Sequence, residues 1–310
     1  MTRHLIGAGG WAYFQVPGEH PLVAYSKAFN FVEVNSTFYE IPSLKLVESW
    51  RTTVPPDFEF AVRCNKALTH NYKFQPIPQA FEILEKMINI CSTLNAEILH
   101  VQTPPTFQPT QANVDLIRDF FSTADLKDIR IALETRGAKR PLNLDLIHTM
   151  QDYNMIDCVD LTKDEEPAYN SDILYARLFG KGVHNVYQPT DEELRKIDKK
   201  TSQGDNKTAA VSFHYIRMYK DAARFKLYKQ TGKFPMVTQS TGLSSLEEIL
   251  REDTKFPSSK KELIHYQGWK LIDLTEAKRT RASYLLQKLP EKTYSNISEV
   301  IQTLESTKPW

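Results

Sequence analysis

The chain is organised around residues 31–42, which read Phe-Val-Glu-Val-Asn-Ser-Thr-Phe-Tyr-Glu-Ile-Pro. Phe31, Val32 and Val34 favour a buried β-strand, and the residues that follow place an acid, an amide, a hydroxyl and a phenol where this strand enters a loop. Such a group of polar side chains indicates a functional site at the strand end. The structural alternative, that these side chains cap the next helix, stays open from this stretch alone.

Outward from this stretch, short apolar runs alternate with helical patterns. Strands are predicted at residues 4–7, 31–35, 59–63, 98–102, 129–134, 155–160, 173–178 and 209–214, and helices at 22–29, 43–50, 81–94, 114–121, 142–150, 191–199 and 218–228. Each parallel strand needs a crossover, usually a helix, and eight such units close a sheet. The pattern predicts an α/β fold, a (β/α)8 TIM-type barrel over residues 1–232, whose sixth crossover at 165–171 is too short and proline-broken for a regular helix.

The alternation stops after Gly232, and residues 233–310 are predicted to form a small α-rich C-terminal extension. Helices are expected at residues 244–251, 282–289 and 297–304, a polar loop at 255–261, and short strands at 263–266 and 269–272. A basic cluster, Lys278 to Arg281, fits either a contact with nucleic acid or a solvated helix face.

Composition is that of an ordinary globular chain, with 310 residues, 41% hydrophobic and 25% charged, which excludes disordered and fibrous classes. The net charge of +1 does not demand a nucleic-acid partner, so a phosphate site must come from local residues. Cys64, Cys91 and Cys158 lack a metal-ligand spacing and indicate reduced core thiols. Because no signal peptide or membrane-spanning stretch is recognisable, we expect a cytoplasmic protein without a membrane partner.

A dinucleotide-binding turn is the main alternative at the N-terminus. Residues 7–12, Gly-Ala-Gly-Gly-Trp-Ala, fit its fingerprint after a strand, and Glu33 ends the next strand, where a ribose-binding acid would lie. That fingerprint needs a helix that starts at the glycines. Pro17, Gly18 and Pro21 prevent such a helix, so the barrel is favoured.

Several motifs together carry a family resemblance. In chain order they are Gly9-Gly10-Trp11, Glu33 to Tyr39, Pro42, Trp50, Phe58 to Arg63, Thr69-His70, Gln102 to Pro105, Ile131 to Arg136 and Tyr175 to Gly180. In these residues the chain resembles the YecE-like proteins, the family catalogued as domain of unknown function 72. The resemblance implies a TIM-type barrel without an established activity, distantly similar to the barrels of type-four apurinic endonucleases and sugar isomerases. The chain differs from the family pattern at Phe213-His214-Tyr215, where members usually carry an Asn-Asn pair.

Active sites of this fold lie at the carboxyl ends of the strands, which we call the mouth of the barrel. The sequence does not decide which member of each alternating pair points inward. We predict Glu33, Glu134 and His70 as catalytic residues, with the two carboxyls as general base and acid whose pKa values are pushed apart by neighbouring arginines. A buried salt-bridge network is the structural alternative. Substrate-binding residues are predicted to be Trp11, Asn35, Thr37, Tyr39, Arg63, Gln102, Arg136, Arg177, Lys181 and His214.

Arginines at the mouth are suited to hold a phosphate or carboxylate through forked hydrogen bonds, and Lys181 lies in a glycine loop that could add to a phosphate site. A divalent metal is an alternative cofactor, but no ligand spacing supports it among the candidate ligands His70, His100, His214, Glu33, Glu134 and Asp160.

Two functions follow. One is an enzyme, a hydrolase, lyase or isomerase, that acts by acid–base chemistry on an anionic or sugar-containing small molecule. The other is a non-catalytic nucleic-acid-binding protein that uses the same basic and aromatic mouth, with the extension as a second contact.

Overall fold

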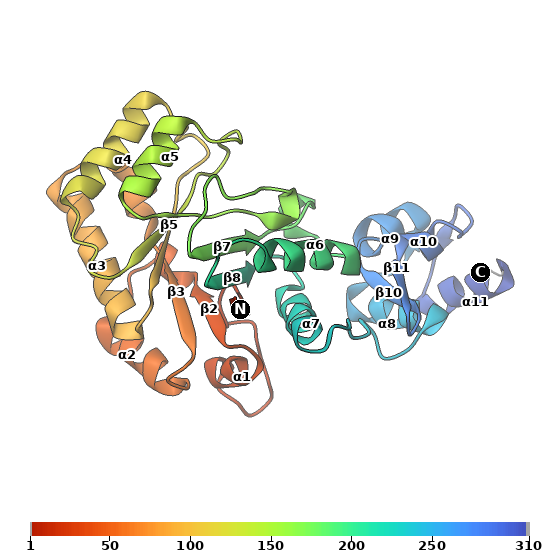
Figure 1. Cartoon of the computed structure of the whole chain (residues 1–310). Helices are drawn as coiled ribbons and strands as arrows, with labels where there is room; N and C mark the ends of the chain where they lie inside the picture. Colours follow the sequence, from red (N-terminus) through yellow and green to blue (C-terminus); the bar gives the residue numbers. More distant parts are fainter. Residues whose placement is uncertain (1, 308–310) are drawn as a thin grey trace. The chain divides into compact units, whose positions relative to one another are not determined.

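The computed structural model describes residues 2–307, and the chain divides into two compact units (Figure 1). The first unit runs to residue 179 and includes residues 196–214 and 218–223. The second contains residues 180–195 and 215–217 and the chain from residue 224 onward. A domain boundary after Gly232 stays a prediction. Each unit is described by itself.

Parallel strands form the sheet of the first unit, in the order β6-β5-β4-β3-β2-β1-β8-β7. They are β1 (Arg3–Ala8), β2 (Phe31–Val34), β3 (Glu59–Arg63), β4 (Ile98–Gln102), β5 (Arg130–Glu134), β6 (Ile156–Asp157), β7 (Ile173–Leu178) and β8 (Thr208–Phe213). The two ends of this order meet through a parallel bridge between Val159 and Ala176. The sheet is therefore nearly closed, and the fold is the predicted (β/α)8 TIM-type barrel.

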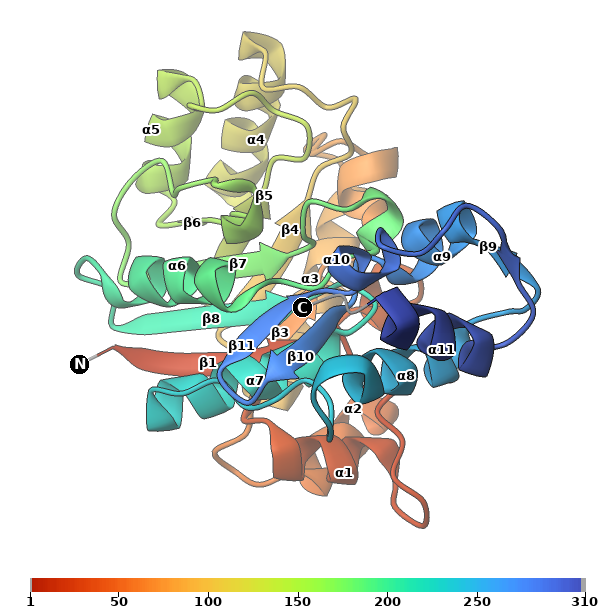
Figure 2. The same cartoon turned by 90° about the vertical axis from the view of Figure 1, so that its right-hand side faces the viewer.

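Helices alternate with these strands along the chain. They are α1 (Pro21–Ala28), α2 (Leu44–Thr53), α3 (Pro78–Leu94), α4 (Gln111–Thr123), α5 (Leu144–Asp152), α6 (Asp191–Ser202) and α7 (Met218–Thr231). Figures 1 and 2 show α3, α4 and α5 on the outer side of the strands. Side-chain oxygens of Ser43, Thr110 and Asn143 cap α2, α4 and α5 by accepting from the backbone N–H three residues later. The termini of these helices thus follow from local sequence.

The sixth crossover departs from this regular pattern. Between β6 and β7 the described chain carries only the short 3-10 turn η3 (Leu161–Lys163), as the proline-broken sequence predicted. Strand β6 is shorter than the predicted strand at residues 155–160. The reason is that Asp160 leaves the sheet to cap η3, where its side chain accepts from Thr162 N–H.

The barrel interior consists of layers that follow from the two-residue period of a strand. One buried apolar layer contains Leu5, Phe31, Ala61, Ile98, Ala132, Ile156, Tyr175 and Ala210. Two residues further along each strand, the next layer contains Gly7, Glu33, Arg63, His100, Glu134, Cys158, Arg177 and Ser212. This second layer is largely polar and lies at the mouth, which answers the inward or outward question that the sequence left open.

The second unit has its own apolar core, a cluster that includes Leu246, Leu263, Ile272, Leu285 and Tyr294. The elements around this core are α8 (Gly242–Asp253), β9 (Ser258–Ser259), α9 (Lys260–Gln267), β10 (Leu271–Thr275), β11 (Lys278–Arg281), α10 (Ser283–Leu286), β12 (Thr293–Tyr294) and α11 (Ile297–Thr307). Strand β10 pairs with β11, and β9 pairs with β12, both antiparallel.

Two predictions for this unit are wrong. Residues 263–266 lie in α9 instead of a strand, because Ser259 and Glu262 form a reciprocal capping box that starts a helix just before this apolar run. The cluster Lys278–Arg281 forms β11 instead of a helix face, since it pairs with β10. Over residues 2–307, no helix combines the length and apolar character that a membrane crossing requires.

Candidate active site at the barrel mouth

Arg177 is the centre of the mouth and is almost completely buried. Its Nε and Nη2 donate to the two carboxylate oxygens of Glu33, at 2.9 Å to Oε2 and 2.9 Å to Oε1. Its Nη1 donates to Oε2 of Glu134 and, at 3.1 Å, to the side-chain oxygen of Gln102. One guanidinium thus joins residues that come from β2, β4 and β5.

Glu33 is fully buried, and both of its carboxylate oxygens are occupied. Besides Arg177, the Tyr175 hydroxyl donates to Oε2, and Nε2 of His214 lies 3.6 Å from Oε1. Burial raises the pKa of Glu33, but the Arg177 guanidinium and the neighbouring His214 imidazole outweigh burial and hold this pKa well below its ordinary value. Glu33 is therefore a permanent carboxylate that anchors its neighbours.

Glu134 is the more accessible of the two predicted catalytic carboxyls, with 15% of its side chain exposed. His100 Nε2 lies 3.0 Å from Oε2, which also accepts from Arg177, whereas Oε1 has only Arg136 Nε at 3.5 Å. Burial raises the pKa of Glu134, but Arg177 and His100 lower it strongly. Arg177 contacts both carboxylates and lowers the pKa of both, and the expected separation of their pKa values into an acid and a base stays a prediction.

Arg63 carries the charge at the mouth that lacks a carboxylate partner. Its Nη1 donates to Asn35 Oδ1 at 3.2 Å and its Nη2 to the Gln102 side-chain oxygen at 2.9 Å. The guanidinium stacks on the Phe38 ring at 3.7 Å. Within residues 2–307, no carboxylate oxygen lies within 4.0 Å of this guanidinium, although Arg63 is only 8% exposed. Burial and the charge of Arg177 lower the pKa of Arg63. Such a cation favours the approach of an anion.

His214 follows β8 and faces Glu33 across the mouth. Its Nε2 lies 2.9 Å from Ser212 Oγ, and its Nδ1 lies 3.5 Å from the Asn35 amide nitrogen. That amide also donates to Gly9 O at 3.0 Å. A Cβ at Gly9 would lie 2.4 Å from both Asn35 and His214, so only glycine lets these two side chains meet. Burial and Arg177 lower the pKa of His214.

His100 is fully buried behind Glu134 and stacks on the Tyr175 ring at 5.9 Å. Burial and the charge of Arg177 lower the pKa of His100 to about 4. Its imidazole is therefore neutral near pH 7, and its Nε2–H is assigned as the donor to Glu134.

His70 lies in the π-helical turn η2 (Ala67–Asn71) that follows β3. Its Nδ1 is 2.8 Å from Thr69 Oγ1, and its ring meets the Phe38 ring edge-on at 5.3 Å. Burial and the charges of Arg63, Lys66 and Arg136 lower the pKa of His70. His70 is thus neutral near pH 7 and surrounded by positive charge.

The other predicted binding residues differ in their surroundings. Thr37 is buried and donates to the backbone oxygens of Val34 and Arg63, at 2.8 and 2.6 Å, so its hydroxyl fixes the chain instead of facing a ligand. Trp11 is half-buried against Trp50, at 5.3 Å. Tyr39 is 68% exposed. Lys181 is exposed and belongs to the second unit.

Sequence reasoning missed Tyr175, Ser212 and Phe179. Tyr175 and Ser212 contact Glu33 and His214 as described above, and Phe179 stacks on His214 at 4.8 Å with Arg177 above its ring at 5.0 Å. The period of two could have found them, because Tyr175, Arg177 and Phe179 lie on one side of β7 and its extension.

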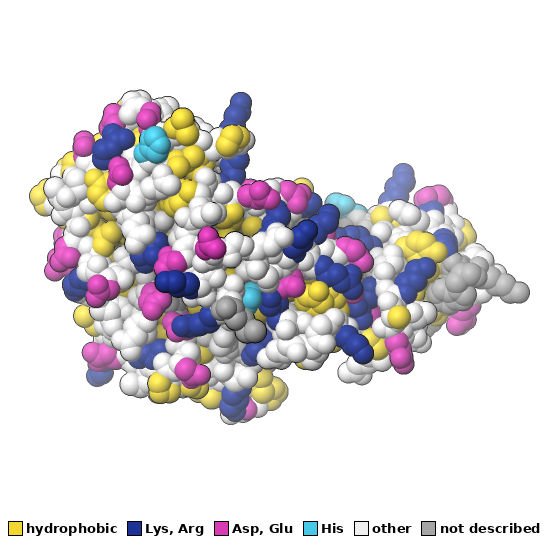
Figure 3. All heavy atoms as spheres, viewed as in Figure 1, with side chains coloured by type: hydrophobic (Ala, Val, Ile, Leu, Met, Phe, Trp, Pro, Cys, Tyr) yellow, Lys and Arg dark blue, Asp and Glu magenta, His cyan; other side chains and the backbone are white. Residues whose placement is uncertain are grey.

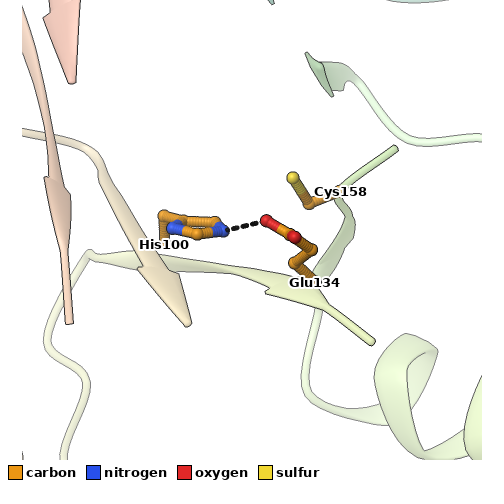
Figure 4. A group of neighbouring side chains, drawn as sticks. All are labelled: His100, Glu134 and Cys158. Atoms are coloured by element: carbon orange, nitrogen blue, oxygen red, sulfur yellow. Dashed lines mark hydrogen bonds and ion pairs between the residues drawn. The ribbon is translucent and has the colours of Figure 1, made fainter. Parts of the chain in front are cut away.

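A group of possible metal ligands lies within the mouth. One ligand atom each of His100, Glu134 and Cys158 lies within 4.8 Å of the others (Figure 4). Within residues 2–307, no other group of three such side chains lies this close together. The donor types fit a transition metal. However, Oε2 of Glu134 already accepts from Arg177, and burial and the Glu134 charge raise the pKa of the Cys158 thiol. A cation would have to displace Arg177 from Glu134 and ionise the thiol, so these residues fit a metal poorly in this arrangement.

Two hollows lie along the sixth crossover, away from the residues described above. One of about 240 Å³ is lined in part by Tyr169, Lys200 and Asn206, and one of about 590 Å³ in part by Arg140. Asp157 points to this side, where Arg140 binds its two oxygens at 2.7 and 2.8 Å. Near these hollows Arg140 pairs with Asp157 and Lys200 with Glu166, whereas Arg63 at the mouth faces no carboxylate among residues 2–307.

Known proteins resemble this chain at the level of family and fold. The model of the family described as "Protein of unknown function DUF72" matches residues 5–232. A curated relative, the UPF0759 protein YunF of Bacillus subtilis (strain 168), is 28% identical over 146 residues, which are 43% of this chain and 50% of that protein. The chain therefore spans about half the length of this relative.

Solved structures support the fold. A DUF72 family protein from Enterococcus faecalis V583 is similar with a TM-score of 0.57 and 18% identity, over 75% of this chain and 99% of that chain. A DUF72 family protein from Thermotoga maritima MSB8 is similar with a TM-score of 0.57 and 16% identity, over 74% and 99%.

Proposed function

This chain belongs to the DUF72 family of proteins of unknown function, and from that premise and its barrel mouth we propose that it is an enzyme. The proposed reaction is acid–base chemistry on an anionic, hydroxyl-bearing small molecule. The observation that supports this best is a pairing at the mouth. Arg63, a cation that faces no carboxylate among residues 2–307, accompanies the imidazole of His214, whose lowered pKa keeps it neutral near pH 7 and whose Nε2 lies 2.9 Å from Ser212 Oγ and 3.6 Å from Glu33 Oε1.

His214 is the group best suited to move a proton. Arg63 donates to the Asn35 oxygen, so the Asn35 nitrogen faces His214 and donates to Nδ1. Nδ1 is then the acceptor, and Nε2 carries the hydrogen on the side of Glu33. The 3.5 Å contact of Nδ1 with Asn35 is long, so a substrate hydroxyl can replace it. The imidazolium that forms would be stabilised by Glu33, which acts as a positioning residue.

Glu134 would contribute charge instead of a proton. Its lowered pKa makes it a weak base and a poor acid near pH 7. Its oxygen Oε1, which has no hydrogen bond in the described structure, could accept from a substrate hydroxyl or stabilise positive charge that develops in the transition state. In this scheme His70 contacts the anionic end of the substrate.

Nucleic-acid binding without catalysis is the less favoured function. It would use the basic cluster Lys278–Arg281 as a second contact, yet Arg279 pairs with Asp191 and Asp273, and Arg281 stacks on Tyr187 at 5.3 Å. Both arginines therefore already have interaction partners within the second unit. The face in Figure 3 shows Lys and Arg side chains interspersed with Asp and Glu, without a continuous basic stripe.

Turnover assays test the proposal. The full chain would be screened against phosphosugars, sugar acids and short oligonucleotides, with and without a chelator, first by thermal shift and then for product. We expect a small molecule to raise Tm and to be converted, and His214→Gln to lower kcat by roughly 10²–10⁴ with little change in binding. The exposed His148→Gln is the matched control.

Two other outcomes would contradict the proposed metal-free enzyme. Oligonucleotide binding that falls log-linearly with salt, persists in His214→Gln and comes with no turnover would identify a binding protein. Activity lost to the chelator and restored by a divalent ion would place a metal in the reaction, despite the poor fit of His100, Glu134 and Cys158.

A further inference from the structure

The cationic side of the mouth points to the chemical class of the substrate's anionic group, an inference that rests on the proposed function. We propose that this group is a phosphomonoester and that it binds between Arg63, Arg136 and His70.

Arg63 and Arg136 come from β3 and β5, the two strands that flank β4. Arg63 ends β3, Gln102 ends β4, and Arg136 lies two residues beyond the end of β5. Gln102 accepts from Arg63 at 2.9 Å and from Arg177 at 3.1 Å, and it thereby fixes the distance between the two guanidinium groups. Arg136 has 43% of its side chain exposed, so it can turn toward a ligand.

His70 belongs to the same cluster through a shared aromatic ring. The Phe38 ring carries the Arg63 guanidinium at 3.7 Å and meets the His70 ring at 5.3 Å. Thr69 binds Nδ1 of His70 at 2.8 Å and thereby orients the imidazole. The other charged groups that act on His70 are Lys66, which is exposed on the same loop, and Arg136.

The charge balance of the mouth distinguishes classes of anion. At the strand ends, Glu33 and Glu134 supply two negative charges, and Arg63, Arg136 and Arg177 supply three positive ones; Lys66, on the loop near His70, is exposed to solvent and is left out of this balance. The surplus of one positive charge matches the single negative charge of a carboxylate. A phosphomonoester carries about −1.5 to −2 near pH 7, so it requires one further positive charge.

His70 can supply that charge. Burial and the surrounding cations keep the pKa of His70 below its ordinary value, so the imidazole is neutral near pH 7. A dianion placed among Arg63, Arg136 and His70 reverses the sign of the local field and favours imidazolium. Binding of a dianion should therefore take up a proton from solvent, whereas binding of a monoanion should not.

Calorimetry with simple anions tests on the full chain whether a dianion binds with proton uptake. Sulfate is the dianion probe because its charge is constant from pH 6 to pH 8, acetate is the monoanion probe, and inorganic phosphate is the ligand of interest. Titrations in two buffers of different ionisation heat count the protons taken up. We expect sulfate and phosphate to bind more tightly than acetate by about tenfold or more, with sulfate binding coupled to proton uptake.

Variants separate the proposed site from nonspecific binding. Arg136→Gln should weaken sulfate binding by about tenfold. Arg118→Gln is its matched control, since the two arginines have 43% and 39% of their side chains exposed and each lies near one carboxylate. His70→Gln should abolish proton uptake and leave weaker sulfate binding. In an NMR titration, sulfate should raise the titration midpoint of His70.

The outcomes are decisive in both directions. Equal affinity for sulfate and acetate, an unchanged His70 midpoint, or equal effects of Arg136→Gln and Arg118→Gln would overturn the inference. Turnover of an unphosphorylated substrate would also overturn it but would leave the proposed function standing. Conversely, proton-coupled sulfate binding in a chain that converts no substrate would support the phosphate site and contradict the enzymatic function.

Discussion

Each unit contains an arginine between two carboxylates, buried in the case of Arg177 and largely buried in the case of Arg279, and the two networks differ in how completely they are closed. In the second unit, Arg279 lies between Asp191 and Asp273. Asp273 is fully buried, and its Oδ2 also accepts from the N–H groups of Val237 and Thr238, at 2.7 and 3.0 Å. This carboxylate ties a loop to the β10–β11 hairpin, which is a structural task.

The network at the barrel mouth is open by comparison. Arg177 lies between Glu33 and Glu134, but Glu134 has 15% of its side chain exposed and one oxygen that accepts no hydrogen bond from residues 2–307. Next to it, Arg63 has amide partners instead of a carboxylate. A similar buried ionic core therefore serves two purposes. Where the arginine faces carboxylates and no cation is left over, as at Arg279, the core stabilises the fold, and where charge is left over, as at Arg63, we propose that it binds an anion.

The largest effect on stability is expected from the buried pair of Arg177 and Glu33, in which both carboxylate oxygens are occupied. Arg177→Met should lower the free energy of unfolding by roughly 3–5 kcal/mol, because Glu33 would stay buried without a cation. Urea denaturation measures this, and Arg118→Met, at a half-exposed arginine, should change it by less than about 0.5 kcal/mol. A loss below about 1 kcal/mol for Arg177→Met would show that Glu33 does not depend on Arg177.

The matching substitution in the second unit should cost less. Arg279→Met leaves Asp273 with its backbone donors and Asp191 with Arg224 at 3.0 Å, so a loss of roughly 2–3 kcal/mol is expected. Faster hydrogen exchange at the Val237 and Thr238 amides, which donate to Asp273, would report this loss of stability near the substitution. If the cost equals that of Arg177→Met, the distinction between a closed and an open network fails.

Acid should lower the free energy of unfolding, because protons bind to His100 more readily in the unfolded chain. The pKa of His100 is about 4 in the folded protein against 6.5 ordinarily, so between these values the unfolded chain binds more protons. The contribution of His100 to stability is therefore lost as pH falls from 6.5 toward 4, by about 2 kcal/mol at pH 5. Unfolding of wild type and His100→Gln at pH 7 and pH 5 measures it. An equal acid-induced loss in both proteins would contradict this assignment.

The smallest effect on stability is expected where charge is left over. Arg63→Gln removes a buried cation that has no carboxylate partner, so the free energy of unfolding should change by no more than about 1 kcal/mol in either direction. Sulfate affinity should nevertheless fall by about tenfold or more. A strong destabilisation with unchanged sulfate affinity would make Arg63 a structural residue like Arg177.

Much of the fold could be predicted because its signals are local. Apolar runs of strand length, caps such as Ser43 and proline-broken segments such as the sixth crossover act over a few residues. The strands of the first unit appear where the sequence indicates, although β6 is shorter than predicted. The error at residues 263–266 has a local cause as well. A short apolar run fits a strand or a buried helix, and the capping box of Ser259 and Glu262 decides between them.

The candidate site was only partly predictable. Its position at the carboxyl ends of the strands follows from the fold, and Glu33, Asn35, Arg63, Gln102, Glu134, Arg177 and His214 do come together there. Their pairing does not follow from sequence, because Arg177 and Glu33 are 144 positions apart and meet only when the barrel closes. The lowered pKa values of Glu33 and Glu134 have the same origin.

The sequence by itself therefore determined the succession of strands and helices, the barrel and the end of the barrel at which chemistry belongs, since hydrophobic period and capping are properties of neighbouring residues. The tertiary structure alone decided which polar side chains turn inward, which carboxylates Arg177 neutralises and that Arg63 is left without one. The physical reason is that charge balance in a buried site depends on distances between distant strands, and these distances exist only once the sheet has closed.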